Sequence, residues 1–167
     1  MCGIAGELRL VAGEVASLER VRAMCAVMLH RGPDDLGVFH DAEVALGMRR
    51  LAIVDVAGGR QPLGNEDETV RVVCNGEIYN APALARELEQ RGHRLRTRSD
   101  VEVIAHLYED YGADLARHLD GMFAFALWDA RRRRLLLGRD RIGIKPLYLA
   151  QLPDRLLWGS EAKCLLA

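Results

Sequence analysis

The chain has 167 residues, of which 50% are hydrophobic and 28% charged, a composition that suits one globular domain with a sizeable core. Its 23 Lys and Arg residues nearly balance 24 Asp and Glu residues, so no global charge attracts nucleic acid or an acidic membrane surface. No stretch reaches the ~18 apolar residues of a membrane helix, and Glu7 and Arg9 interrupt any signal-peptide core. We therefore expect a cytoplasmic protein without nucleic-acid or membrane partners.

Short apolar segments with strand-like patterning dominate the chain and are separated by Gly, Pro, Asp or Asn. The expected strands are Gly3–Leu10, Leu36–His40, Val44–Met48, Leu51–Asp55, Val70–Cys74, Met122–Trp128, Leu135–Arg139, Pro146–Leu149 and Leu156–Gly159. The run Arg131–Arg134 lies between two of these strands, which favours a solvated hairpin tip over a nucleic-acid patch.

Helical spacing and cap residues predict fewer helices. They run from a Ser17 cap to before His30, from after Asn80 to Gly92, and from a Ser99–Glu102 capping box to Gly112. The two central helices fall together, with strands on either side. This order favours stacked, largely antiparallel sheets flanked by helices over a doubly wound parallel sheet.

Three of the four cysteines and the five histidines form no disulfide or metal-binding motif. Cys25, Cys74 and Cys164 lack CxxC spacing and are expected to be buried apolar side chains in a reducing compartment. No HExxH motif or His/Cys cluster is present, so we expect no metal site. The histidines are His30, His40, His93, His106 and His118.

Cys2 directly follows the initiator methionine and becomes the first residue once Met1 is removed. One residue then carries both a thiol nucleophile and a free α-amine, whose ordinary pKa values are about 8.5 and about 7.7–8.0. The amine can take the thiol proton near neutral pH without a separate His or Asp. With Met1 attached, the Cys2 nitrogen is a peptide amide, and we expect such a chain to be inactive.

Asn75 and Gly76 offer a side-chain amide and a backbone N–H in adjacent positions at the end of a predicted strand. Such donors can stabilise the oxyanion that develops when a thiolate attacks an amide. The alternative is a type I′ hairpin turn, for which Asn-Gly is the commonest signal. The dipeptide alone leaves both interpretations open.

Charged residues suggest a site for a free amino acid. Arg50 can form a bidentate pair with an α-carboxylate, and Glu77 and Asp100 can receive an α-ammonium group. Two of these residues also have a simpler interpretation: Arg50 as a surface residue beside Arg49, and Asp100 as a favourable negative charge in the first turn of a helix.

Taken in order, the motifs of this chain resemble the class II glutamine amidotransferase domain of asparagine synthetases over essentially the full chain. The motifs Asn75–Asn80 and Gly143–Tyr148 favour this branch over amidophosphoribosyltransferases and glucosamine-phosphate synthases. The segments that carry the resemblance are Met1–Gly6, His30–Asp34, Arg50–Asp55, Asn75–Asn80, Ser99–Ile104, Gly121–Ala126 and Arg139–Tyr148.

The resemblance implies an α+β fold of the N-terminal-nucleophile hydrolases, a four-layer αββα sandwich with two stacked antiparallel sheets. It also implies hydrolysis of glutamine to glutamate and ammonia. By motif, Cys2 is the nucleophile, and Asn75 and Gly76 form the oxyanion hole. The residues expected to bind substrate are Arg50 for the carboxylate, Glu77 and Asp100 for the ammonium group, and Leu51, Ile53 and Val54 as pocket walls. Arg139–Tyr148 is expected to be structural or to face a partner domain.

Residues 1–167 are expected to form a single glutaminase domain. The helix starting near Ser160 has no terminating signal, which is typical of an excised domain. Family members continue into an ATP-dependent synthetase domain, whose Gly-rich pyrophosphate loop does not occur here. ATP and Mg²⁺ are expected only in that domain, present in cis or on a partner subunit, and no cofactor is expected in this one.

Several alternatives stay open at this point. The ammonia acceptor is aspartate by default, but other carboxylates are possible in related proteins, and a homodimer is possible. The domain could instead be a catalytically silent glutamine-binding module, because an isolated half can lack the closed conformation its partner imposes. It could also be an N-terminal-nucleophile hydrolase of another amide.

Overall fold

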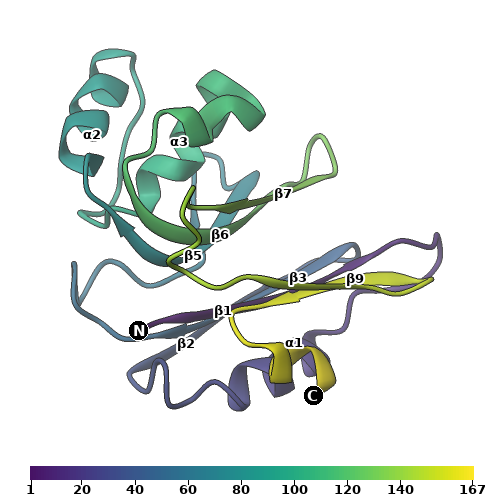
Figure 1. The fold of residues 1–167 in the computed structure, drawn as a ribbon. Coiled ribbons are helices and arrows are strands. Elements are labelled where there is room, and N and C mark those ends of the chain that lie inside the picture. The colour runs from purple at the N-terminus through teal and green to yellow at the C-terminus, as the bar shows by residue number, and fades with distance from the viewer.

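Two antiparallel sheets lie face to face in the computed structural model, which describes residues 1–167 (Figure 1). The first sheet has the order β2-β3-β1-β9-β8, so β1 lies at its centre, and the second has the order β4-β5-β6-β7. The first consists of β1 (Gly3–Arg9), β2 (Asp35–His40), β3 (Val44–Arg50), β8 (Tyr148–Gln151) and β9 (Arg155–Gly159). The second consists of β4 (Leu63–Gly64), β5 (Val70–Ile78), β6 (Gly121–Asp129) and β7 (Arg134–Arg139).

Helices cover the outer face of each sheet (Figure 1). The helices α2 (Ala81–Gln90) and α3 (Glu102–Tyr111), with the short 3-10 helix η1 (Gly112–Arg117), lie over the second sheet. The helix α1 (Leu18–Ala26) and the 3-10 helix η2 (Ala162–Leu166) lie over the first. This arrangement confirms the predicted αββα sandwich. No helix is long and apolar enough to cross a bilayer.

Three apolar clusters fill the spaces between the four layers. In β5, Val73 packs between the two sheets with Ile4 and Trp158, whereas Val72 and Cys74 pack toward α2 and α3. Successive residues of a strand point to opposite faces, so a strand buried on both sides is a continuous apolar run. A third apolar cluster packs between α1 and the first sheet.

Most of the predicted elements are confirmed. The Ser17 side chain caps α1 by accepting a hydrogen bond from the Arg20 backbone N–H at 3.1 Å. Gly92 and Gly112 follow α2 and α3 with positive φ, as expected for glycines that end helices. The Arg131–Arg134 segment turns between β6 and β7, where Arg131 pairs with Asp67 at 2.7 Å. The hairpin-tip interpretation is therefore confirmed.

Two local predictions are wrong. Leu51–Asp55 is a loop, not a strand: Ile53 is 75% exposed, and the chain turns at Asp55 with φ of 44°. The Ser99–Glu102 capping box does not form either. The buried Glu102 carboxylate instead accepts hydrogen bonds from the backbone N–H groups of Arg96 and Thr97, at 2.6 and 2.7 Å. It thereby fixes the loop before α3. The short strand β4 was not predicted.

Candidate active site

A cavity of about 240 Å³ lies where Cys2, the loop after β3, the end of β5 and the segment before α3 meet. All the residues predicted for the site line it, although they come from distant parts of the chain. Its size is below the ~300–1,000 Å³ of drug-sized pockets, which suits a small metabolite. The lining residues are Met1, Cys2, Arg50, Leu51, Ile53, Val54, Gly59, Gln61, Cys74, Asn75, Gly76, Glu77, Ser99, Asp100, Val101, Met122 and Lys145.

Cys2 is half-buried at the start of β1, and hydrogen bonds hold both its backbone and its thiol. Its sulfur accepts a hydrogen bond from the Leu51 backbone N–H, with an N–S distance of 3.3 Å. Its carbonyl oxygen accepts one from Arg31 Nε at 2.8 Å, and Arg31 pairs with Glu161 at 3.0 Å. The thiol therefore has a fixed position at the cavity wall.

Asn75 and Gly76 lie inside β5, so the hairpin-turn interpretation is wrong. The Asn75 side chain is 1% exposed, and its Nδ2 atom has no hydrogen-bond partner. A buried amide donor without a partner costs about 1–3 kcal/mol, so this one is available to an acceptor bound in the cavity. A Cβ at Gly76 would lie 2.1 Å from the Met122 carbonyl oxygen of β6, so only glycine fits this close approach.

Arg50 is the last residue of β3 and is 5% exposed, so it is not a surface arginine. Its guanidinium donates to the backbone carbonyls of Val54, Asp55 and Val56 at 2.8–3.1 Å. These bonds fold the loop that supplies the cavity walls. A guanidinium has more N–H donors than these bonds use, so donors remain for a ligand.

Asp100 and Glu77 place two carboxyl groups on the wall of the same cavity. Asp100 Oδ2 accepts a hydrogen bond from the Ile78 backbone N–H at 2.8 Å. Burial raises the pKa of Asp100 above its ordinary value; backbone hydrogen bonds oppose the shift, while the neighbouring Glu77 carboxylate adds to it. Two crowded carboxylates at a partly buried wall favour a bound cation such as an ammonium group.

The sequence analysis assigned no site role to Gln61, Ser99 and Lys145, three polar residues that line the cavity. The Gln61 side chain binds the backbone of Cys74, accepting from its N–H at 2.7 Å and donating to its carbonyl at 3.3 Å. Lys145 is 5% exposed, and its Nζ lies 3.6 Å from the sulfur of Met1. The motif around Lys145 gave the only signal for it, but that motif was interpreted as structural or partner-facing.

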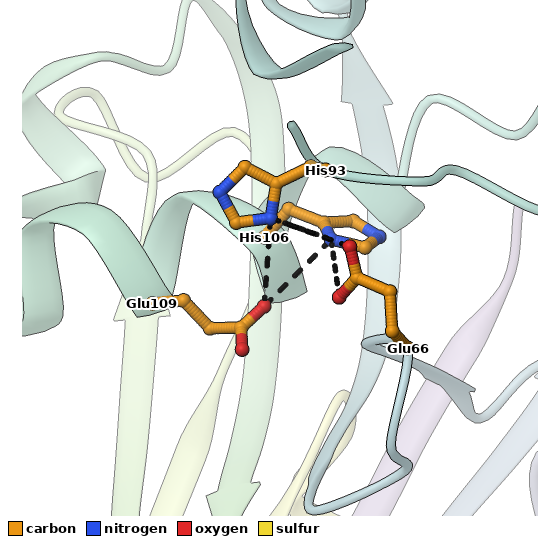
Figure 2. Close-up of side chains that lie close together, drawn as sticks. All are labelled: Glu66, His93, His106 and Glu109. Carbon is orange, nitrogen blue, oxygen red and sulfur yellow. Dashed lines mark hydrogen bonds and ion pairs between the residues drawn. The ribbon is translucent and has the colours of Figure 1, made fainter. Parts of the chain in front are cut away.

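The sequence has no local metal-binding motif, and we expected no metal site, but the fold brings together four side chains of types that can bind a metal. Glu66, His93, His106 and Glu109, hereafter the histidine cluster, lie together outside the Cys2 cavity (Figure 2). Three separate segments supply these residues, so no local motif exists to reveal them.

The fold and the site together define a class. Two stacked antiparallel sheets between helix layers, with a cysteine before the central strand facing a cavity, are the architecture of N-terminal-nucleophile hydrolases. A solved structure with this fold is the glutamine phosphoribosylpyrophosphate amidotransferase from B. subtilis, complexed with ADP and GMP. It superposes with a TM-score of 0.80 at 22% identity, covering 98% of this chain and 43% of that one.

The chain belongs to the glutamine amidotransferase domain family, which it matches over residues 1–167. It is 40% identical over 169 residues to asparagine synthetase [glutamine-hydrolyzing] 3 of Bacillus subtilis, covering 100% of this chain. It is 46% identical over 166 residues to asparagine synthetase [glutamine-hydrolyzing] 3 of Arabidopsis thaliana, covering 99% of this chain. The chain spans 28% of the length of each of these relatives.

Proposed function

We propose that the protein hydrolyses glutamine to glutamate and ammonia, with Cys2 as the nucleophile. The observation that carries this proposal is the partnerless Asn75 Nδ2 in the same cavity as the Cys2 thiol. A buried donor beside a nucleophile is an arrangement that stabilises a developing oxyanion. Because the chain belongs to the glutamine amidotransferase domain family, we propose glutamine as the amide substrate.

The reaction follows from these groups. The Cys2 α-amine takes the thiol proton, and the thiolate attacks the side-chain amide carbon of glutamine. Asn75 Nδ2 and the Gly76 N–H stabilise the resulting oxyanion. The intermediate collapses as the α-ammonium returns the proton to the leaving nitrogen, which releases ammonia and leaves a thioester. Water then adds to the carbonyl carbon of the thioester. Cleavage of the carbon–sulfur bond yields glutamate and restores the Cys2 thiol.

The cavity also accounts for recognition of a free amino acid. Arg50 would bind the α-carboxylate, and Glu77 and Asp100 would bind the α-ammonium group. Leu51, Ile53 and Val54 line the same cavity and would enclose the methylene groups. An amide without these charged ends would lose most of its contacts, which favours glutamine over other amides.

The ammonia would serve an ATP-dependent amidation. The relatives are longer proteins named as asparagine synthetases, so we propose a synthetase domain, in cis or on a partner subunit, that uses ATP and Mg²⁺ on aspartate or another carboxylate. No cofactor is proposed for the domain described here. A cytoplasmic location fits the free thiols of all four cysteines.

The test compares processed and unprocessed protein. Intact-mass spectrometry gives the fraction of chains without Met1, and ammonia release from glutamine should rise in proportion to that fraction. Full activity in a preparation that retains Met1 throughout would contradict the free-amine mechanism.

Variants at two cysteines complete the test. Cys2→Ala should abolish turnover but retain glutamine binding by calorimetry, because the proposed carboxylate and ammonium contacts lie elsewhere. Cys164→Ala, which changes a cysteine that does not line the cavity, is the matched control and should keep turnover. Glutamine binding without ammonia release from processed parent protein would instead indicate a silent binding module.

A further inference from the structure

The histidine cluster joins three segments on the helical side of the second sheet (Figure 2). Glu66 lies in the turn between β4 and β5, and His93 lies in the loop after α2. His106 and Glu109 lie one turn apart on α3. One potential ligand atom from each residue falls within a group whose members are all within 4.8 Å of one another.

The distances within the cluster match a small coordination sphere. The two Nδ1 atoms of His93 and His106 are 3.3 Å apart. Each Nδ1 lies 3.4–3.5 Å from a Glu66 oxygen and 3.7 Å from Glu109 Oε2. A tetrahedron with zinc–ligand bonds of about 2.1 Å has edges of about 3.4 Å, so one ion fits among these atoms with small adjustments.

A carboxylate lies near the Nε2 atom of each imidazole ring. His93 Nε2 lies 3.2 Å from Asp110 Oδ1, and His106 Nε2 lies 3.7 Å from Glu102 Oε1. Asp110 can accept a hydrogen bond from His93 Nε2 in the tautomer that leaves Nδ1 as an acceptor, whereas the same tautomer of His106 places its proton on a buried Nε2 that has no hydrogen-bond partner. Carboxylate–histidine pairs of this kind orient the ligands of zinc sites.

The two glutamates are oriented from outside the cluster as well. Glu66 Oε1 accepts a hydrogen bond from the Arg94 backbone N–H at 2.8 Å. Glu109 Oε1 accepts one from Asn65 Nδ2 at 3.0 Å, which leaves Oε2 toward the histidines. With both rings in this tautomer, four acceptors converge with no donor among them. In that tautomer the four acceptors favour a bound cation.

We propose that the histidine cluster binds one Zn²⁺ ion as a structural site. Two imidazoles and two carboxylates suit a borderline-soft metal better than Mg²⁺ or Ca²⁺, which prefer oxygen ligands alone. The carboxylates would neutralise the ion. His106 is fully buried, whereas Glu66 and Glu109 are about one-third exposed, which gives the ion a route from solvent.

The ion would cross-link the β4–β5 turn, the loop after α2, and α3. Four protein ligands close the coordination sphere, so the site would stabilise the fold and would not activate water. It lies outside the Cys2 cavity and does not depend on the proposed glutaminase activity.

The test measures zinc binding to the whole chain in a Cys2→Ala background, because an accessible thiol would bind zinc itself. After removal of metal with a chelator, competitive titration against a chromophoric zinc indicator should show one ion per chain. His93→Asn and Glu109→Gln should each weaken binding by at least about tenfold, because even second-shell changes cost about 10–100-fold. Glu87→Gln, on the exposed face of α2, is the matched control and should bind like the parent.

Two further readouts distinguish the possible occupants. Co²⁺ bound in place of zinc should give a tetrahedral visible spectrum without a thiolate charge-transfer band. Zinc should raise the melting temperature of the parent but not of His93→Asn, and Mg²⁺ should leave both unchanged. The proposal is overturned if the Cys2→Ala protein takes up no zinc, or if His93→Asn binds as tightly. It is also overturned if the melting temperature of the parent does not respond to zinc.

Discussion

The Cys2 cavity and the histidine cluster each contain polar groups whose partners are missing, but the missing partners have opposite character. Asn75, which lines the cavity, has a buried donor, Nδ2, without an acceptor, and we propose that this donor stabilises the negative charge of the oxyanion. In the cluster, two imidazole Nδ1 atoms and two carboxylates converge, and all of them are acceptors when both rings carry their proton on Nε2. An unsatisfied polar group in a well-packed fold therefore indicates the chemistry of its ligand as well as its position.

Asn75→Ala tests the role of the partnerless donor in the cavity and should have the largest effect. Removing one oxyanion donor should lower kcat by about 10²–10³ with a smaller change in KM. Steady-state ammonia release measures both constants. Asn80→Ala is the control within the same motif, because the Asn80 side chain binds the backbone of His118 and Asp120 and does not line the cavity. Unchanged kcat in Asn75→Ala would remove the oxyanion assignment.

Arg50→Ala tests whether the arginine serves the substrate as well as the loop. The loss of a charged hydrogen-bonding group should raise KM by about 10–100-fold and should also lower stability, because backbone carbonyls lose their donor. The decarboxylated analogue of glutamine separates the two roles. The parent should strongly prefer glutamine over this analogue, and Arg50→Ala should lose the preference. If Arg50→Ala still prefers glutamine over the analogue, Arg50 holds the loop but does not bind the substrate carboxylate.

Asp100→Asn should show a trade-off between binding and stability. Because the pKa of Asp100 is raised in the fold, the stability that protonated Asp100 contributes is present at low pH and is lost as the pH rises through that pKa. The neutral asparagine avoids this loss. At pH 7 the substrate-free variant should melt no lower than the parent, while KM rises by about tenfold or more. Thermal melts across pH 3–7 measure the difference, and a variant that is less stable at pH 7 would contradict it.

Glu109→Gln should have the smallest effect on turnover. Glu109 does not line the cavity, so kcat/KM should stay within about twofold of the parent even though zinc binding weakens. Ammonia release at matched zinc concentrations measures this. A large loss of kcat would show that the two sites are energetically coupled through α3.

Prediction from sequence succeeded where the signal was local. Ser17, Gly92 and Gly112 act on the ends of helices next to them, and alternating apolar residues identified most strands. The cavity residues that were predicted each lie within a short motif. All of them line one cavity, but their catalytic and binding roles stay predictions.

Prediction failed where distant segments decide the structure. Leu51–Asp55 has a strand-like sequence, but the buried Arg50 draws the carbonyls that follow into a loop. The Glu102 carboxylate does not form the expected capping box and instead accepts hydrogen bonds from the backbone N–H groups of Arg96 and Thr97. His93 and His106 meet only because the loop after α2 folds back on α3, and a single sequence contains no pattern for that contact.

The central position of β1 has a consequence for the nucleophile. Chain ends normally fray, yet the strand that starts one residue after Cys2 pairs with β3 from Gly3 and with β9 from Ala5. Opening it would separate the sheet in its middle, so the backbone amides of Ile4 and Ala5 should exchange with solvent only when the whole domain unfolds. Removing Met1 leaves these pairs untouched. The proposed nucleophile is thus anchored next to the strand that we expect to exchange most slowly.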